Sequence, residues 1–415
     1  MSPHVIDLRT AASPDEVRDV VHRAVQALAE GKVVAFPTET VYVLAASALH
    51  ESSVTKLSEL AKAATAKSQS GTSDRMVLAV KSADEALDYV PDLCPMGQRL
   101  GRRCWPGPVT LVVDDHHPDS LLKQLTPAVQ QVVAPAGRLS LRVPAHETIH
   151  EVLRLLAGPV VIANAPTGGA TEAVTAQEVI ESVGGHVQLV LDDGRSRFGQ
   201  PSSVVHVDDN RYDVLRVGVV SPQTIHRLAS VLVLFVCTGN TCRSPMAEGM
   251  FRRAVADRLG CRPEEVEDRG IIVTSAGIAA MNGGRASPEA VIVMREMGID
   301  LERHESQPLT EALVRHADLI LTMTRSHRQA VLSQWPDAVE RTKLVSRLSA
   351  DVADPVGGPA ELYRRCATQV RGELDAWLDE LGIGAADSAN SAAASSNGDA
   401  ANASKKNGSN SAKKG

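Results

Sequence analysis

Aromatic residues are scarce in this chain, at 3% of its 415 residues. Proteins that bind single-stranded nucleic acid by stacking need such rings, so the composition argues against that class. An excess of positive charge is also lacking, because 43 basic residues face 50 acidic ones and the net charge is -7. This excludes a generally basic protein that coats DNA, but it does not exclude a local basic groove.

Cysteine is rare as well, and the six cysteines are too scattered for a disulfide scaffold. No Cys-x-x-Cys pairs indicate a structural zinc site, so we expect no metal. The longest apolar run, Val231 to Cys237, is far too short to span a membrane, and the first residues, MSPHVIDLRT, lack the pattern of a signal peptide. The expected setting is the reducing cytoplasm, without a membrane partner.

The length indicates two or three domains at about 150 residues each, and 43% hydrophobic with 22% charged residues is a usual globular mixture. From about Ala385 the chain consists of small and polar residues without periodic apolar positions, which predicts a disordered tail over 385–415. A polar segment at 221–230, read as a short helix or a linker, divides the remainder. We expect one domain over 1–228 and another over 229–384.

The first domain should open with an amphipathic helix. Ser13 is its expected N-cap, Pro14 lies in the first turn, Glu16 completes a capping box, and Gly31 ends the helix. The predicted buried face of this helix is Val17, Val20, Val21, Ala24 and Leu28. Further helices at 147–156 and 176–182 alternate with strands at 32–36, 76–80, 109–113, 139–143, 160–163 and 188–191, which is a mixed α/β layout.

The second domain alternates more regularly between strands and helices. The strands are predicted at 231–236, 271–275, 319–323 and 343–345, and the helices at 245–259, 288–297, 326–333 and 359–381. Repeated βα units predict a doubly wound parallel sheet, with functional residues at the carboxyl ends of its strands.

The segment from Cys237 to Pro245, CTGNTCRSP, joins the first of these strands to a helix. A loop of small residues at a helix N-terminus can direct several backbone N–H groups at an anion. The positive electrostatic potential of these N–H groups and of the nearby Arg243 guanidinium favours the thiolate form of Cys237, which is the nucleophilic form. Ser244 can hydrogen-bond that thiolate. A merely buried cysteine at a strand end would not require the Cys-x5-Arg-Ser spacing.

Attack of a thiolate on a phosphoryl group needs an acid for the leaving group. Asp354, in the Gly- and Pro-rich segment VADPVGGP, can supply that acid from a loop. Alone, an Asp-Pro pair usually indicates a turn, and it is the cysteine loop that gives this pair its significance.

The loop CTGNTCRSPMAE, then TSAG at 274–277, ADLILTMT at 317–324 and Asp354-Pro355 resemble the low-molecular-weight protein-tyrosine phosphatases over essentially all of 231–382. The resemblance implies a phosphatase of phosphorylated proteins that needs no cofactor. It implies a phosphocysteine at Cys237, phosphate binding by Arg243, and Asp354 as acid and then base. The implied phosphate loop comprises Thr238, Gly239, Asn240, Thr241, Cys242 and Ser244, with Asn240 holding its shape. Cys242 is either a disulfide partner of Cys237 under oxidation, as the resemblance suggests, or a packed thiol.

Two features narrow the substrate. Val356, Gly357 and Gly358 follow Asp354-Pro355, where a phosphotyrosine pocket would carry aromatic rings. Thr241 is a polar residue at a position where a larger aliphatic one is common. Both features, with SQPLTEALV at 306–314, resemble the protein-arginine phosphatase branch. A guanidinium leaving group would also find an ionic partner in Asp354, so we favour phosphoarginine over phosphotyrosine.

Several phrases of the first domain each read as a strand and a turn when taken alone. They are KVVAFPTETVY at 32–42, CWPGPVTL at 104–111, LRVP at 141–144, Ala163-Asn164, GQPSSV at 199–204 and LRVG at 215–218. Together, across 5–228, they resemble the Sua5/YrdC family, which has a twisted α/β sheet with a basic concave face. The resemblance implies a threonylcarbamoyl-AMP synthase that uses ATP, with or without Mg, threonine and bicarbonate, and that serves tRNA modification, with tRNA or other RNA as a further partner. Matching positions assign the nucleotide and threonine site to Thr38, Lys62, Arg142, Asn164, Ser202 and Arg216.

Three positions depart from that family's pattern. Val43 replaces a usual glycine, Ile162 replaces a serine, and Ala64 replaces the arginine of a Lys-x-Arg grip on the triphosphate, of which Lys62 remains. The first domain is therefore either an active synthase or a degenerate nucleotide- or RNA-binding module that targets the phosphatase. A scaffold without catalysis in either half is a third reading.

Overall fold

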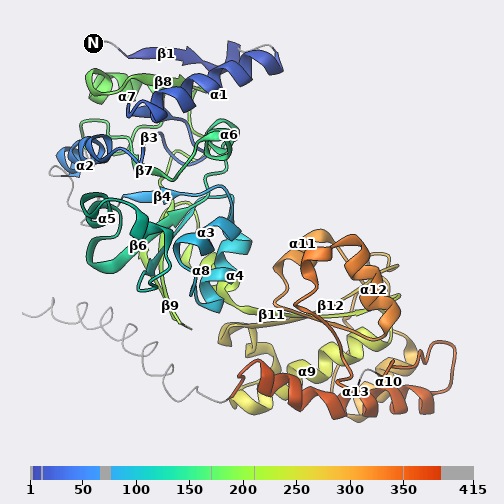
Figure 1. Cartoon of the computed structure of the whole chain (residues 1–415). Helices are drawn as coiled ribbons and strands as arrows, with labels where there is room; N and C mark the ends of the chain where they lie inside the picture. The colour runs from blue at the N-terminus through green and yellow to red at the C-terminus, as the bar shows by residue number, and fades with distance from the viewer. Residues whose placement is uncertain are drawn as a thin grey trace, which may run out of the picture. The chain divides into compact units, whose positions relative to one another are not determined.

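The computed structural model describes residues 3–10, 13–65, 76–169, 171–209, 211–348 and 350–384. The chain divides into two compact units, Met1–Ala229 and Ser230–Gly415, which we call the first and the second unit (Figure 1). The predicted tail over 385–415 lies outside the described residues. Both units are α/β, as predicted, with a mixed sheet in the first and a parallel sheet in the second.

The sheet of the first unit has ten strands in the order β1-β8-β2-β3-β7-β4-β6-β5-β9-β10. It mixes parallel pairs, such as β1 with β8, and antiparallel pairs, such as β3 with β7. The strands are β1 (His4–Asp7), β2 (Val34–Phe36), β3 (Val43–Ser47), β4 (Val77–Ala79), β5 (Val109–Asp114), β6 (Arg138–Arg142), β7 (Val160–Asn164), β8 (Leu189–Asp192), β9 (Ser203–Asp208) and β10 (Arg211–Arg216). The helices are α1 (Pro14–Ala29), α2 (Glu51–Thr65), α3 (Ala83–Tyr89), α4 (Pro95–Cys104), α5 (Pro127–Val133), α6 (Glu147–Leu155), α7 (Ala176–Val183) and α8 (Pro222–Ala229).

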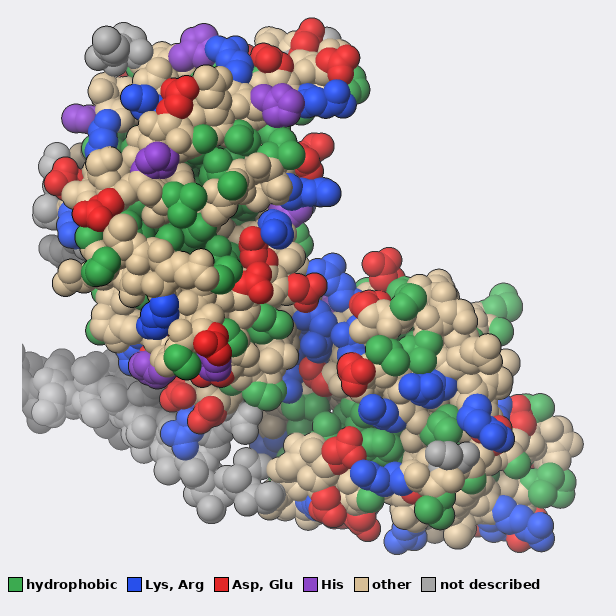
Figure 2. Space-filling view, in the orientation of Figure 1, with side chains coloured by type: hydrophobic (Ala, Val, Ile, Leu, Met, Phe, Trp, Pro, Cys, Tyr) green, Lys and Arg blue, Asp and Glu red, His purple; other side chains and the backbone are tan. Residues whose placement is uncertain are grey.

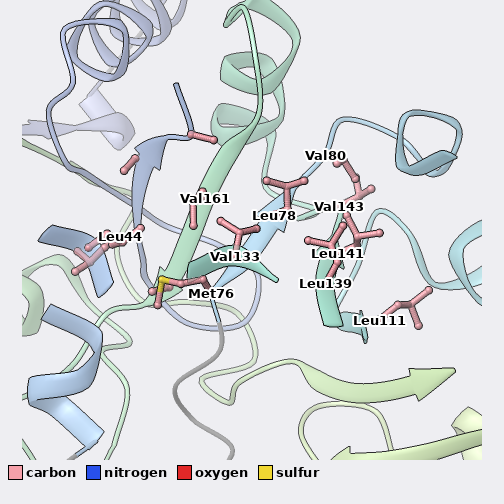
Figure 3. Packing of buried hydrophobic residues seen from close by; sticks show 14 of the residues in the cluster. Leu44, Met76, Leu78, Val80, Leu111, Val133, Leu139, Leu141, Val143 and Val161 are labelled. Carbon is pink, nitrogen blue, oxygen red and sulfur yellow. The ribbon is translucent and has the colours of Figure 1, made fainter. Parts of the chain in front are cut away.

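The two faces of this sheet differ in what they bury. One face carries Leu44, Leu78, Leu141 and Val161, which pack with residues of α2, α4, α5 and α8 in one large core (Figure 3). On the other face, α1 and α6 pack on residues of β2, β3, β4, β7 and β8. Side chains alternate along a strand, and in β6 Leu139 and Leu141 point into the large core. Ser140 and Arg142 therefore point to the second face. This polar part of the sheet carries the residues that the sequence assigned to nucleotide binding.

Helix α1 begins as predicted, with the Ser13 hydroxyl accepting the backbone N–H of Glu16 at 3.3 Å. Its buried residues include Val20, Val21, Ala24 and Leu28. Val17 was wrongly placed on this face, since it is 37% exposed. Val17 lies in the first turn, where the helix borders an open cleft instead of the sheet.

The segment at 221–230 contains helix α8, which belongs to the first unit. Ile225 and Ala229 of α8 are 0% and 4% exposed and lie in the core with residues of α4 and β9. The segment was read as a helix or a linker, and most of it is a packed helix, because its apolar residues recur at positions i and i+4 and so share one face.

The second unit has four parallel strands in the order β12-β11-β13-β14. They are β11 (Val231–Cys237), β12 (Ile271–Gly277), β13 (Leu319–Thr322) and β14 (Thr342–Leu344). The helices are α9 (Arg243–Leu259), α10 (Pro288–Glu296), α11 (Glu311–His316), α12 (Arg325–Gln334) and α13 (Ala360–Glu380). The chain leaves β11 toward β12 on one side and returns to β13 on the other, and loops meet at such a reversal of strand order.

Acidic and basic side chains are interspersed on the visible face of each unit, in keeping with the small net charge (Figure 2). Within the described residues, no helix has the length and apolar character needed to cross a membrane.

Candidate active site

The cysteine loop connects the end of β11 to the start of α9 in the second unit. The side chain of Cys237 is buried, and its Sγ lies 2.9 Å from the Ser244 hydroxyl. The backbone N–H of Asn240 donates to the same sulfur at 3.3 Å. These donors, at the N-terminus of a 17-residue helix, would stabilise a negative charge on the sulfur.

Asn240 fixes the shape of this loop. Its φ of 53° lies in the left-handed region, which asparagine tolerates better than most residues. Its Nδ2 donates to the Ser244 hydroxyl at 3.0 Å and to the Ser275 hydroxyl at 2.8 Å, while its Oδ1 accepts the backbone N–H of Gln307 at 2.9 Å. The His304 ring also contacts the Asn240 carbonyl oxygen at 2.7 Å. The loop is thus held from the neighbouring strand and from the segment at 304–307.

Gly277, the last residue of β12, allows the loop to lie against the sheet. The backbone N–H groups of Ile278 and Ala279 donate to the carbonyl oxygens of Cys237 and Thr238, both at 3.0 Å. A Cβ at position 277 would come within 2.4 Å of the Thr238 carbonyl oxygen and 2.9 Å of the Asn240 nitrogen. Only glycine permits this approach.

Arg243 and Asp354 are brought together beside this loop. Arg243 is 5% exposed, and its guanidinium donates to the Val352 carbonyl oxygen at 3.3 Å and to the Thr238 hydroxyl at 3.4 Å. It also contacts the Asp354 carboxylate at 2.5 Å. The Asp354 side chain is 45% exposed, so it stands at the open side of a site whose cation is buried.

His327 contacts the same loop from α12. Its Nε2 lies 2.9 Å from the Thr238 hydroxyl and its Nδ1 lies 2.9 Å from the Thr324 hydroxyl, which caps the helix. Burial, together with the nearby Arg243 guanidinium, lowers the pKa of His327 to about 4. A neutral ring therefore stands next to the buried Arg243 guanidinium.

We expect the His327 ring to titrate at about pH 4 and to be neutral well above that pH. NMR of the histidine Cε1–Hε1 signals measures this titration. Since its folded pKa lies below the ordinary histidine value of about 6.5, the stability that His327 contributes is complete above pH 6.5. That stability is lost as the pH falls through about 4, because protonation then favours the unfolded chain. His327→Gln identifies the signal, and a signal that titrates near 6.5 would contradict the prediction.

Thr241 and Cys242 face a second polar cluster behind the loop. Cys242 Sγ lies 3.3 Å from the Ser287 hydroxyl and 3.7 Å from the Tyr363 hydroxyl, and the Thr241 carbonyl oxygen accepts the Ser287 N–H at 2.9 Å. All six cysteines are free thiols, Cys237 and Cys242 included. Burial raises the pKa of Tyr363 to about 12, so its hydroxyl stays protonated in this cluster.

In the first unit, one small cavity collects four of the six residues that the sequence assigned to nucleotide binding. Its lining includes Arg142, Asn164, Ser202 and Arg216. The open volume is about 20 Å³, which is room for about one water molecule. A nucleotide would therefore require this cavity to widen.

Arg142 is held in the wall of that cavity by an ion pair. Its guanidinium contacts the Glu39 carboxylate at 2.6 Å, the Thr40 hydroxyl at 2.9 Å and the Gly107 carbonyl oxygen at 3.2 Å. The side chains of Arg142 and Glu39 are 2% and 10% exposed. Most of the cation's donors face protein acceptors, so this residue is fixed before any ligand binds.

Arg216 and Asn164 close the other side of the cavity. The Arg216 guanidinium donates twice to the Ser202 carbonyl oxygen, at 3.2 and 3.1 Å, and burial lowers its pKa while the nearby Glu172 opposes that shift. The Asn164 amide donates to the Glu172 carboxylate at 3.4 Å. Glu172 thus adds an acidic group beside two residues expected to bind a nucleotide.

The remaining predicted residues of the first unit lie elsewhere. Thr38 is buried and bonded to Thr40 at 2.9 Å, and it lines a neighbouring cleft instead of this cavity. Lys62 is exposed on α2, which packs on the opposite face of the sheet from Arg142. Ile162 lines the cavity with an apolar group, and Val43 is buried at 1% in the core beneath α1 and α6. Ala64 lies in α2, and the segment at 66–75 is outside the described residues.

Comparison with known proteins identifies the second unit. The family model described as low molecular weight phosphotyrosine protein phosphatase matches residues 232–386. A protein-arginine-phosphatase of Bacillus subtilis is 42% identical over 153 residues, which cover 36% of this chain and 93% of that protein. The second unit belongs to the low-molecular-weight phosphotyrosine protein phosphatase family. A probable low molecular weight protein-tyrosine-phosphatase, EpsP, of Ralstonia nicotianae is 36% identical over 36% of this chain and 94% of its own length.

The first unit matches a different family. The Sua5/YciO/YrdC model, described as telomere recombination, covers residues 26–218. A threonylcarbamoyl-AMP synthase of Pyrococcus abyssi is 28% identical over 228 residues, which cover 55% of this chain and 62% of that protein. The first unit is a Sua5/YrdC domain, and this chain spans less than two thirds of that relative's length. The chain thus joins a phosphatase-family domain to a Sua5/YrdC domain.

Sequence reasoning missed the residues that support the phosphatase-family loop from a distance. His304 and Gln307 bind Asn240 across more than 60 positions of the chain. His304 and Gln307, three positions apart in HESQ, gave no signal of their own, because the order of strands in the sheet determines which residues they contact. His327 had a weak signal, since it stands three residues after the helix cap Thr324. In the part of the chain that the structure describes, no group of three or more His, Cys, Asp or Glu residues could hold a metal ion.

Proposed function

We propose that the second unit is a cysteine-dependent protein phosphatase whose substrate is phosphoarginine in proteins. The observation that carries the proposal is the contact of Arg243 with Asp354 at 2.5 Å beside the Cys237 loop. It unites a nucleophile, a buried cation for the phosphoryl oxygens and an acid at the mouth of the site. A reducing compartment such as the cytoplasm fits a reaction that depends on a free thiolate.

In the first step, the Cys237 sulfur attacks phosphorus, and the S–P bond forms as the P–N bond to the substrate guanidinium breaks. Arg243 turns from Asp354 to bind two phosphoryl oxygens with its planar fork. Asp354 donates its proton to the leaving nitrogen. In the second step, the Asp354 carboxylate takes a proton from water, whose oxygen attacks phosphorus and breaks the S–P bond. Phosphate leaves, and Ser244 stabilises the thiolate that is restored.

The distribution of rings in the second unit supports phosphoarginine over phosphotyrosine. Its aromatic residues are Phe235, Phe251, Trp335, Tyr363 and Trp377. Four of them are at most 4% exposed, and Trp335 packs against a separate apolar cluster. Val356, beside Asp354, is 63% exposed but offers no ring for a phenol to stack on. The 42% identity with the relative named protein-arginine-phosphatase points the same way.

Two matched peptides that differ only in phosphoarginine or phosphotyrosine test this preference. We expect kcat/KM to be at least about tenfold higher for the phosphoarginine peptide, since an ionic leaving group gains the Asp354 contact and a phenol gains no stacking wall. Phosphate release from both peptides is measured on the full chain. Turnover of the phosphotyrosine peptide without turnover of phosphoarginine would overturn the preference.

For the first unit we propose adenylation of the threonylcarbamoyl type, from ATP, threonine and bicarbonate. What supports it is the convergence of Arg142, Asn164, Ser202 and Arg216 on one cavity, where the buried guanidinium of Arg142 and the half-buried one of Arg216 would meet a nucleotide's negative charge. Pyrophosphate is the leaving group. The alternative is a degenerate nucleotide- or RNA-binding module, which the missing Lys-x-Arg grip at Ala64 favours.

Pyrophosphate release distinguishes the two. We expect release that depends on both threonine and bicarbonate and that falls at least about tenfold in Arg216→Ala, because one charged fork is lost. Arg211→Ala, on the exposed start of the same strand, is the matched control and should leave the rate unchanged. Binding of ATP or RNA without pyrophosphate release would identify the degenerate module instead.

A further inference from the structure

A groove of the second unit lies along the open edge of its sheet, and none of the residues of the cysteine loop line it. Strand order places β14 at that edge, with β13 as its one neighbour in the sheet. The groove, of about 920 Å³, runs between α12, β14 and the end of α13, the two helices being labelled in Figure 1. Its lining includes Arg325, Arg328, Gln329, Lys343, Arg347 and Trp377.

The groove is strongly basic. Four cations and one carboxylate, Glu380, line it. Arg325 pairs with Asp351 and Arg347 pairs with Glu380, which leaves two cations without a carboxylate partner among the described residues. Arg328 donates to the Thr342 carbonyl oxygen at 2.9 Å, and Lys343 has no polar side-chain partner in the part of the chain described. An acidic ligand would complete both.

The main chain of β14 offers a second point of attachment. Alternate residues of a parallel strand turn their N–H and C=O groups to opposite sides. The Arg341 carbonyl oxygen and the Val345 N–H bond to β13, so Thr342 and Leu344 turn theirs to the open edge. The Thr342 N–H donates to the Val339 carbonyl oxygen, and the Thr342 carbonyl oxygen accepts from Arg328. The N–H and C=O groups of Leu344, which lines the groove, are the ones that an added strand could bind.

We propose that this groove docks an acidic, extended segment of the phosphoprotein substrate, a proposal that rests on the function assigned to the second unit. One end of the groove is the Arg325–Asp351 pair, and Asp351 precedes the catalytic Asp354 by three residues, at most about 11 Å of extended chain. A segment bound along β14 therefore lies within a few residues' reach of the site. Acidic side chains of that segment would pair with Arg328 and Lys343, which line the same groove.

The experiment compares two phosphopeptides in the full chain, one with a run of Glu and Asp beside the phosphorylated residue and one with Gln and Asn instead. Wild-type protein should show a KM about tenfold lower for the acidic peptide at low salt, with a similar kcat. The double variant Lys343→Glu/Gln329→Glu alters one partly exposed and one exposed residue of the groove without removing any contact described above. It should abolish that KM difference and leave hydrolysis of p-nitrophenyl phosphate unchanged.

Arg371→Glu, an exposed site on α13 outside the groove, is the matched control and should retain the difference. Fluorescence anisotropy of a labelled, unphosphorylated acidic peptide measures binding without catalysis. A groove that does not bind the peptide can therefore be distinguished from a second unit that is not a phosphatase. Equal KM values for the two peptides in wild-type protein would overturn the proposal. So would single-stranded RNA that displaces the acidic peptide and binds more tightly, since the groove would then serve nucleic acid.

Discussion

Replacement of Cys237 by serine is expected to lower phosphatase activity by at least about 10⁴-fold, to the limit of detection. The substitution keeps the size of the side chain, so the loop held by Asn240 and Ser275 should remain intact. A serine hydroxyl is a far weaker nucleophile than a thiolate, and the donors around this position stabilise an anion that serine does not form near neutral pH. Hydrolysis of p-nitrophenyl phosphate and of a phosphoarginine peptide would measure the loss.

The matched control for this variant is Cys261→Ser, at a partly exposed free thiol just after α9. It should keep wild-type activity. Unchanged hydrogen-exchange protection of β11 and α9 in Cys237→Ser would establish that the loss is chemical. Substantial residual turnover by Cys237→Ser would mean that another group carries the phosphoryl transfer, and the proposed function would fall.

Replacement of Glu39 by alanine should destabilise the first unit by about 3–5 kcal/mol. The Arg142 guanidinium would remain buried at 2% exposure without its carboxylate partner, and the Ala145 N–H, which Glu39 accepts at 3.0 Å, would also lose its acceptor. Breaking a buried ion pair on one side costs more than the pair contributes, because an uncompensated charge stays in the interior.

Hydrogen exchange with mass spectrometry reads this change in peptides of β6 and β2 without averaging over the second unit. The matched control is Arg138→Gln, at the start of β6. It removes one partner of a surface ion pair with Asp114 and should lower the stability by less than about 1 kcal/mol. If hydrogen-exchange protection of β6 falls no more in Glu39→Ala than in Arg138→Gln, the prediction is wrong and Arg142 has found another acceptor.

Local chemistry in the sequence was enough to propose Cys237 as the nucleophile and Arg243 as the cation of the second unit, since both belong to one short loop. Asp354 was proposed as the acid as well, although only the presence of the cysteine loop distinguished the Asp-Pro pair from an ordinary turn. The contacts of Asn240 with Ser275 and Gln307 could not be predicted, because they depend on which strands become neighbours. Periodicity identifies strands but not their order in the sheet.

The first unit was harder to predict for the same reason. Short strands such as β3, with its sequence VLAAS, and the polar β10 have little alternation to mark them. The ten-stranded order places β8 between β1 and β2, so residues nearly 190 positions apart become neighbours. The resemblance assigned Arg142, Asn164, Ser202 and Arg216 to one site. It did not anticipate that the Glu39 carboxylate would pair with Arg142 and that Glu172 would accept a hydrogen bond from Asn164.

The close approach at Gly277 has a consequence for speed of binding. The loop proposed to bind phosphate rests on the end of β12 and is attached to the segment after it by backbone hydrogen bonds from Ile278 and Ala279. A receptor that already has its bound shape loses little conformational entropy when a ligand arrives and needs no prior rearrangement. Because Gly277 lacks a Cβ, the sheet can hold the loop in one shape before an anion binds. We therefore expect phosphate to associate in a single step, without a slow conformational change of the loop.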